Sequence, residues 1–414
     1  MTKTPQHNVP ELRFPEFEGE WNILKLNEVL LDKTEGIKRG PFGGALKKEI
    51  FVNEGYAIYE QRNAIYDNQE FRYYINKDKY EEMKSFEVQP GDLIMSCSGT
   101  IGKLSKIPKD YKKGIINQAL IRFRTKSNIL SQYFLFYMRS NIMQRKILEV
   151  NPGSAITNLI PVKELKNLCF PLPNLNEQEK IGTFFSKLDR QIELEEKKLE
   201  LLEQQKKGYM QKIFSQELRF KDENGNEYPE WKQTNFNFFM TKPNALEKGT
   251  NIQKNQLLTV KLQGKGVCKA NENRALKMGA TIYYKRFAGQ FIYGKQNFFN
   301  GAFGIVPNSL NHFYSSSDVP ALDLDNNKIT NNYFINYISR ESYYKKKEAL
   351  SSGTGSKRIH EDTLLTFDIM LPSIKEQKKI GVFLERLDNL IEKQSIKIKQ
   401  LKQRKQGLLQ KMFI

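Results

Sequence analysis

Histidine and cysteine are scarce in this sequence, and their scarcity removes several kinds of chemistry. The 414 residues include three histidines and three cysteines: His7, His312, His360, Cys97, Cys169 and Cys268. The cysteines are odd in number and widely spaced, so they fit neither a disulfide framework nor a CxxC metal site. The histidines are equally scattered, which argues against a histidine metal cluster or an HNH-type nuclease. We therefore expect incidental thiols, no metal site and no cofactor.

Long apolar runs and targeting signals are absent as well. No segment approaches the ~18 consecutive apolar residues of a membrane-spanning helix, and the opening MTKTPQHNVPELRF lacks the apolar core of a signal peptide. We therefore expect a soluble, cytoplasmic protein. The length favours two or three domains. A hydrophobic fraction of 39% with 27 Phe and 19 Tyr is typical of globular ones.

Positive charge, in contrast, is abundant and is spread over two regions. The chain has 66 Lys and Arg against 47 Asp and Glu. Residues 1–170 hold 26 basic and 20 acidic side chains, and residues 217–370 hold 21 and 15. A polyanion such as nucleic acid is a natural partner for such a protein, because each neutralised phosphate releases counterions. Charge that serves only solubility is the alternative that composition leaves open.

The sequence also repeats itself at an offset of 199 residues. EQEKIGTFFSKLD begins at Glu177 and EQKKIGVFLERLD at Glu376, and 20 of 43 positions are identical between 172–214 and 371–413. Each copy begins with capping-box spacing, Asn174 before Glu177 and Ser373 before Glu376. Apolar residues then recur at alternating spacings of three and four, which predicts a long helix with a coiled-coil stripe. A stripe of ~33 residues spans ~50 Å and is too long to lie on one small domain.

Shorter landmarks show that the repeat extends over the whole chain. LRFPEFEGEW from Leu12 matches LRF from Leu218 with EYPEW ending at Trp231, and YFLFYMRS from Tyr133 matches YFINYISR from Tyr333. We therefore expect a tandem duplication in which residues 1–170 and 217–370 are mixed α/β globular domains, each followed by a helix, at 171–216 and 371–414. Strands are expected within DLIMSCSG, IINQALIRFR, TIYYKRF and GQFIYG.

Catalytic motifs are not found. NPGS from Asn151 lacks the second proline of an amino-methyltransferase loop, and CSGTIGKLS has Cys97 and Leu104 where a phosphate loop needs glycine and a hydroxyl. The globular domains instead carry Arg, Lys, Asn and Gln interleaved with glycine and aromatics, which are side chains that reach phosphates and base edges. The candidates in the first domain are Lys38, Arg39, Lys47, Lys48, Gln61, Arg62, Asn63, Ser98, Lys103, Asn117 and Gln118. Those in the second are Lys261, Gln263, Lys265, Lys285, Arg286, Gln290, Lys295, Gln296, Asn297 and Asn300.

These features together resemble the specificity subunit of type I restriction-modification enzymes. The resemblance rests on the paired helix segments, their endings GYMQKIF and GLLQKMF, the LRF…EW openings, SGTIGK and GIINQA. It implies an α+β protein with two target recognition domains separated by two conserved helices in an antiparallel coiled coil, a pseudo-twofold tandem repeat. It also implies double-stranded DNA, two methyltransferase subunits and restriction subunits as partners, with no catalysis by the chain itself. A stand-alone bipartite DNA-binding regulator and a fused or degenerate nuclease or methyltransferase remain the alternatives.

Polar residues interrupt the apolar stripe at matching places, Glu195 and Lys206 in the first helix and Gln394 and Lys405 in the second. In an antiparallel pair Glu195 can face Lys405 while Lys206 faces Gln394. An unpaired charge in the seam is costly, and a buried polar position can fix register. We therefore predict this register for the helix pair.

Overall fold

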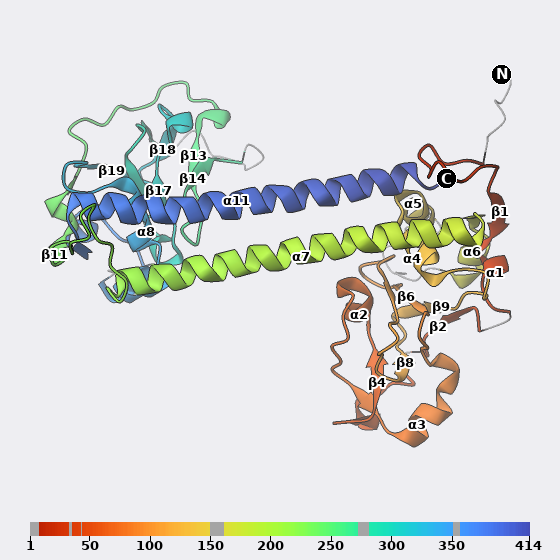
Figure 1. Cartoon of the computed structure of the whole chain (residues 1–414). Coiled ribbons are helices and arrows are strands. Elements are labelled where there is room, and N and C mark those ends of the chain that lie inside the picture. The colour runs from red at the N-terminus through yellow and green to blue at the C-terminus, as the bar shows by residue number, and fades with distance from the viewer. Residues whose placement is uncertain (1–7, 33–34, 43, 150–160, 272–280, 351–356) are drawn as a thin grey trace. The chain divides into compact units, whose positions relative to one another are not determined.

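The computed structural model describes residues 8–32, 35–42, 44–149, 161–271, 281–350 and 357–414. His7, the sequence NPGS from Asn151 and the Gly/Ser segment from Ser351 to Ser356 lie outside these ranges. The chain divides into two compact units: residues 1–197 with 396–414, and residues 198–395. The division passes through the middle of both long helices, α7 (Leu175–Phe214) and α11 (Ile374–Lys411), which are seen in Figure 1.

The first unit contains two four-stranded sheets. One has the strand order β2-β9-β6-β7 and the other β3-β5-β4-β8, in which β4 and β8 are parallel. A separate antiparallel pair, β1 with β10, joins the beginning of the domain to its end, with Asn22 opposite Leu172. The strands are β1 (Asn22–Lys25), β2 (Ile37–Arg39), β3 (Phe51–Val52), β4 (Tyr56–Tyr59), β5 (Tyr74–Ile75), β6 (Leu93–Ser96), β7 (Leu104–Lys106), β8 (Gly114–Ile116), β9 (Leu120–Phe123) and β10 (Cys169–Leu172).

Short helices connect these strands. They are α1 (Leu26–Val29), α2 (Gln61–Tyr66), α3 (Lys77–Glu82), α4 (Ser131–Arg139), α5 (Asn141–Glu149) and α6 (Val162–Lys166). Helix α4 supplies more buried aromatics to the core than any other element of this unit, namely Tyr133, Phe134, Phe136 and Tyr137. The same core includes Phe185 from α7 and Phe413, which follows α11.

The second unit repeats the frame of the first. Its four-stranded sheet has the order β12-β19-β16-β17, and β11 pairs with β20 as β1 pairs with β10. The rest of the domain differs, since two-stranded pairs, β13 with β14 and β15 with β18, stand where the first domain has its second sheet. The strands are β11 (Lys232–Asn235), β12 (Met240–Thr241), β13 (Leu258–Val260), β14 (Val267–Lys269), β15 (Tyr283–Lys285), β16 (Phe291–Tyr293), β17 (Phe303–Ile305), β18 (Tyr314–Ser316), β19 (Ala321–Leu324) and β20 (Asp368–Leu371). The helices are α8 (Asn331–Ile338), α9 (Glu341–Tyr344) and α10 (Glu361–Leu365).

The same contacts hold the start of each long helix. The side chain of Asn174 accepts a hydrogen bond from the backbone N–H of Glu177 at 2.9 Å, and Ser373 accepts one from Glu376 at 3.3 Å, which confirms both predicted caps. The two carboxylates are fully buried and pair with the domain-opening arginines, Glu177 with Arg13 at 2.7 Å and Glu376 with Arg219 at 2.9 Å. In each unit, therefore, the arginine of the repeated LRF motif binds the glutamate of the repeated EQ motif.

Within each unit the two helix segments run antiparallel. In the first unit Phe185, near the start of α7, stacks on Phe413, with ring centroids 6.1 Å apart. In the second, Tyr209 near the end of α7 meets Phe383 near the start of α11 at 5.1 Å. These contacts confirm the predicted antiparallel pairing of the repeated helices.

Candidate nucleic-acid interface

Four predicted segments of the first domain come together where its two sheets meet. The backbone N–H of Gly40, after β2, donates to the carbonyl of Leu120 at 3.0 Å, and that of Cys97, after β6, donates to Ala119 at 2.9 Å. The N–H of Asn117, after β8, donates to Tyr59 at the end of β4 at 3.0 Å. The carboxyl ends of β2, β4, β6 and β8 therefore meet at the 117–119 connection, which we call the strand junction. Strand ends commonly carry binding loops, because the sheets beneath them are rigid.

Glycine is required at this junction. A Cβ atom built on Gly40 would lie 1.9 Å from the carbonyl oxygen of Asn117, so no other residue fits between the two backbones. Gly99 has a φ of +60° in the turn from β6 to β7, and its Cβ position lies 3.7 Å from Nε2 of Gln61. The glycines of IKRGPFGG and SGTIGK thus bring the segments that carry Arg39, Gln61 and Ser98 to one place.

The predicted residues of the first domain separate into two groups. Arg39, Gln61, Ser98 and Asn117 are half-buried at the strand junction, where Gln118 and Lys103 are exposed. The others are engaged or lie elsewhere. Asn63 is buried and caps α2 by accepting from the N–H of Glu60 at 2.8 Å, while Arg62 pairs with Glu70 at 2.6 Å. Lys38 lies over the ring of Phe86 at 4.9 Å, and Lys47 and Lys48 are exposed around a short 3₁₀ turn.

In the second domain the corresponding loop lines a cavity. Residues 294–302 connect β16 to β17, as 97–103 connect β6 to β7. The β13–β14 hairpin packs on this loop, since the N–H of Gln263 donates to Asn300 at 2.7 Å and that of Gly264 to Gly301 at 2.8 Å. Between them is an open cavity of about 580 Å³. It is lined by Thr259, Val260, Lys261, Leu262, Gln263, Lys265, Gly294, Asn297, Ala302 and Val319.

The structure thus joins TVKLQGKG and YGKQNFFN, two of the three segments predicted in this domain. Lys261, Gln263, Lys265 and Asn297 share the cavity, and Gln296 and Asn300 are exposed on the same loop. The lining residues Thr259 and Val319 were not among the predicted site residues, because Thr259 is an uncharged residue at the start of TVKLQGKG and Val319 lies outside every predicted segment. Only the pairing of β13 with β14 and the return of the chain before β19 bring them here.

The third segment, YYKRFAGQ, has a structural role at two of its three predicted positions. Arg286 is 2% exposed, and its guanidinium donates to Oγ of Ser315 at 2.6 Å and to the carbonyl of Val319 at 3.1 Å. Burial lowers the pKa of this guanidinium to about 10. Gln290 is 8% exposed and donates to Asp323 at 2.7 Å. These contacts argue against direct DNA contact by either side chain.

Two further predicted lysines in this domain are neutralised by carboxylates. Lys285 pairs with Glu247 at 3.0 Å, and Lys295 with Glu361 at 3.2 Å. Lysine ammonium groups held this way have less free charge to offer a phosphate than Lys261 or Lys265, which are both exposed.

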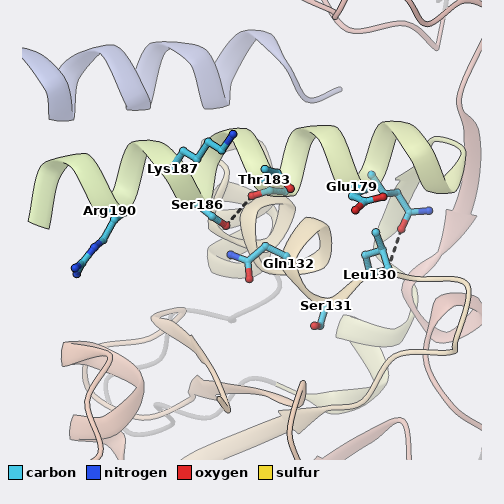
Figure 2. Close-up of a pocket in the computed structure, with 10 residues that line it drawn as sticks. Leu130, Ser131, Gln132, Glu179, Thr183, Ser186, Lys187 and Arg190 are labelled. Carbon is cyan, nitrogen blue, oxygen red and sulfur yellow. Dashed lines mark hydrogen bonds between the residues drawn. The ribbon is translucent and has the colours of Figure 1, made fainter. Parts of the chain in front are cut away.

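A second hollow lies where α4 crosses α7 (Figure 2). This groove measures about 420 Å³, and its rim includes Ser131, Thr183, Lys187 and Arg190. It is built on Gly182, whose Cβ would lie 3.2 Å from that of Gln132, so the two helices cross closely. Ser186 donates to the carbonyl of Gly182 at 2.7 Å and Gln178 accepts from the N–H of Leu130 at 2.9 Å, the two dashed contacts of Figure 2.

The three charged residues of the helix seam all form ion pairs. In the first unit Glu195 pairs with Lys397 at 2.5 Å, and Lys405 pairs with Asp189. In the second, Lys206 pairs with Asp388 at 2.5 Å, and Gln394 is buried. Asp189 with Lys405 and Asp388 with Lys206 are the same pair under the 199-residue repeat. The direct pairings Glu195–Lys405 and Lys206–Gln394 stay predictions.

Neither a metal site nor a membrane-spanning helix is found in the part of the chain that the structure describes. Within those ranges no three His, Cys, Asp or Glu side chains gather in a way that could hold a metal ion. No helix in the same ranges combines the length and apolar character needed to cross a membrane. Of the cysteines, Cys97 is buried, Cys169 exposed and Cys268 half-buried.

Comparison with known proteins identifies relatives over nearly the whole chain. A family model described as the type I restriction modification DNA specificity domain matches residues 20–204 and 269–403. The putative type I restriction enzyme MjaX specificity subunit of Methanocaldococcus jannaschii is 24% identical, over 94% of this chain and 91% of its own length. The type I restriction enzyme StySPI specificity subunit of Salmonella potsdam is also 24% identical, over 73% of this chain and 69% of its own.

Solved structures with the same fold extend this result. The S subunit of a type I restriction-modification system from M. genitalium aligns over 98% of this chain and 99% of its own, with a TM-score of 0.58 and 15% identity. A chain from a structure of complex assembly and conformational transition in the type I R-M system aligns over 95% of this chain and 97% of its own, with a TM-score of 0.51 and 14% identity.

Proposed function

Since this chain belongs to the family of type I restriction-modification DNA specificity domains, we propose that it selects the DNA sequence on which a type I complex acts. The function is recognition, with residues 1–170 and 217–370 as two target recognition domains that read separate parts of an interrupted target. The helical segments 171–216 and 371–414 serve as spacers between them. Methylation and cleavage belong to other subunits.

One observation carries this proposal: two different sets of loops are built on one repeated frame. Both domains contain the same four-stranded sheet and the same closing strand pair. On that frame the first domain presents the strand junction and the second presents the cavity of the β13–β14 hairpin. Two domains that share a frame but carry different recognition loops favour an asymmetric DNA target. Two domains with identical loops would favour a palindrome.

The implied partners follow from the same repeat. Because each recognition domain has its own copy of the helix and of its buried Arg–Glu contact, we expect two methyltransferase subunits, one for each half of the chain. Restriction subunits complete the assembly that cleaves DNA. Double-stranded DNA is the ligand, and the net charge of +19 suits it. The place of action is the cytoplasm.

Domain replacement tests the proposal. The full chain is produced in cells together with its methyltransferase subunits, and methylated positions are mapped by sequencing. Replacing residues 217–370 with another recognition domain should change one half of the methylated sequence and leave the other half intact. The reciprocal replacement of residues 1–170 is the matched control and should change only the other half. A change in both halves from one replacement would contradict independent reading.

A further inference from the structure

Arginines in the first domain are nearly all committed to carboxylates. Six of those that the structure describes pair with acidic side chains: Arg13, Arg62, Arg72, Arg122, Arg124 and Arg139. Within the part of residues 1–170 that the structure describes, Arg39 and Arg145 make no such pair. Arg145 is exposed on α5, whereas Arg39 is half-buried at the strand junction.

The backbone of Arg39 is rigidly placed. Arg39 is the last residue of β2 and lies opposite Ile121 in β9. The next residue, Gly40, is pressed against the carbonyl of Asn117 and donates its N–H to Leu120 at 3.0 Å. The side chain therefore leaves the sheet from a fixed point, at the edge where the loops of the junction meet.

The guanidinium is held at one nitrogen. Its Nε lies 3.5 Å from the carbonyl oxygen of Gln118, a long contact that orients the group without satisfying it. No described residue accepts from the two terminal nitrogens in the structure. These nitrogens form the planar fork that donates two parallel hydrogen bonds to one acceptor group. A half-buried arginine with no carboxylate partner among the described residues is suited to an acceptor pair brought by a ligand.

Gln61 supplies a second unsatisfied donor at the same junction. Its Nε2 is buried without a hydrogen-bond partner among the described residues, next to the open turn at Gly99. Buried donors without acceptors are rare because their desolvation is not compensated. An amide that can turn outward at this turn would gain acceptors from a base edge.

We propose that Arg39 is a specificity-determining residue of the first domain and that it reads a guanine, whose O6 and N7 match the free guanidinium fork, with Gln61 contacting the same half-site. The inference rests on the proposed function. It goes further by naming the side chains and the base. Arginine to guanine is the commonest specific contact in the major groove, because guanine alone presents two acceptors side by side there.

The test uses the full chain assembled with its methyltransferase subunits. Methylation rates are measured on target DNA and on DNA in which single guanines of one half-site are replaced. Arg39→Ala should lower discrimination at one guanine by roughly ten- to a hundredfold and leave the other half-site unchanged. Arg39→Lys keeps the charge but lacks the fork, so it should relax the same position while keeping the salt dependence of binding. Gln61→Ala should weaken or relax recognition of the same half-site only.

Two controls make the outcome specific. Arg145→Ala removes another unpaired arginine of this domain, and Gln89→Ala removes a glutamine that precedes β6, at the end of the strand away from the junction. Neither should alter the motif. If the wild-type assembly methylates no defined sequence, the proposed function fails. If it methylates a defined motif that Arg39→Ala leaves unchanged, or lowers uniformly over all sequences, the guanine assignment is overturned while the proposed function stands.

Discussion

Phe413 packs against Tyr137 of the first domain, with ring centroids 5.7 Å apart. Its counterpart under the repeat, Phe214, packs against Tyr337 of the second domain at 5.2 Å. Each long helix thus ends in an aromatic core, and α11, which follows the second domain in the sequence, ends in the core of the first. The helix is needed twice because each globular domain is completed by the C-terminal end of one copy and the N-terminal start of the other.

Removing this contact should destabilise the first unit. Phe413 is 3% exposed, and a buried Phe→Ala change costs about 3–5 kcal/mol through lost burial and the cavity left behind. Hydrogen exchange of the full chain should therefore show faster opening of α4 and of the first sheet in Phe413→Ala, with the second unit unaffected. Leu201→Ala, at a side chain 64% exposed on α7, is the control and should change stability by less than about 0.5 kcal/mol. Equal effects of the two changes would mean that Phe413 does not complete the core.

Two glycines in α7 should respond in opposite directions to larger side chains. Gly208 has no atom within 4 Å of its Cβ position, so Gly208→Ala should stabilise the protein by about 0.5–1 kcal/mol through lower unfolded-state entropy. Gly182 lies against Gln132 where α4 crosses α7, so Gly182→Leu should destabilise it by about 1–3 kcal/mol. Thermal unfolding of both variants measures the difference. Stabilisation by Gly182→Leu would show that the crossing is looser than the structure has it.

Double-mutant cycles can decide the register of the helix seam. The register expected from the sequence couples Glu195 to Lys405, so that Glu195→Leu destabilises the pair and Lys405→Leu restores much of the loss. The structure gives Glu195 an ion pair with Lys397, half of whose side chain is exposed, and such pairs contribute about 0.2–1 kcal/mol. We expect a measurable coupling between Glu195 and Lys397. A larger coupling between Glu195 and Lys405 would favour the register expected from the sequence.

Stability should decline in alkaline solution. Burial raises the pKa of nine tyrosines: Tyr59, Tyr80, Tyr111, Tyr133, Tyr137, Tyr293, Tyr333, Tyr343 and Tyr344. A raised folded-state pKa stabilises the fold fully below the unfolded value of about 10, and this contribution is lost as the pH rises above it. Arg286, whose pKa is lowered to about 10, acts in the opposite sense between its folded and unfolded values. The tyrosines outnumber it, so tyrosinate absorbance and loss of circular dichroism should rise together above pH 10. Ionisation of all tyrosines at pH 10 without unfolding would contradict this.

Features set by local sequence could be predicted well. The caps at Asn174 and Ser373 and the long helices follow from residue spacing alone, and the hydrogen bonds confirm them. IINQALIRFR was expected to contain a strand and holds two, β8 and β9, because the turn at Asn117 carries the chain from one sheet to the other. That turn is what makes the strand junction.

Features set by tertiary packing could not be predicted. The four-stranded sheet that both domains share leaves no repeat in the sequence between the landmarks, because strand pairing tolerates many side chains of similar character. Arg286 and Lys261 both stand in basic, glycine-containing segments, yet the first is buried and the second exposed. The difference arises from Ser315 and the carbonyl of Val319, which are distant in the sequence and provide the acceptors that let a guanidinium enter the interior.

The β1–β10 and β11–β20 pairs have a consequence for how such a protein can change. Each pair clamps the two ends of a domain side by side, with Asn22 opposite Leu172 and Lys232 opposite Leu371. The chain between the paired end strands leaves and returns at the same place. The number of residues in between therefore does not change the position at which the following helix begins. One such segment holds a second four-stranded sheet and the other holds two separate two-stranded pairs, and the same strand pairing closes both. Each domain can therefore gain or lose whole strands and helices while the strand pair that closes it, and the start of the helix that follows, stay in place.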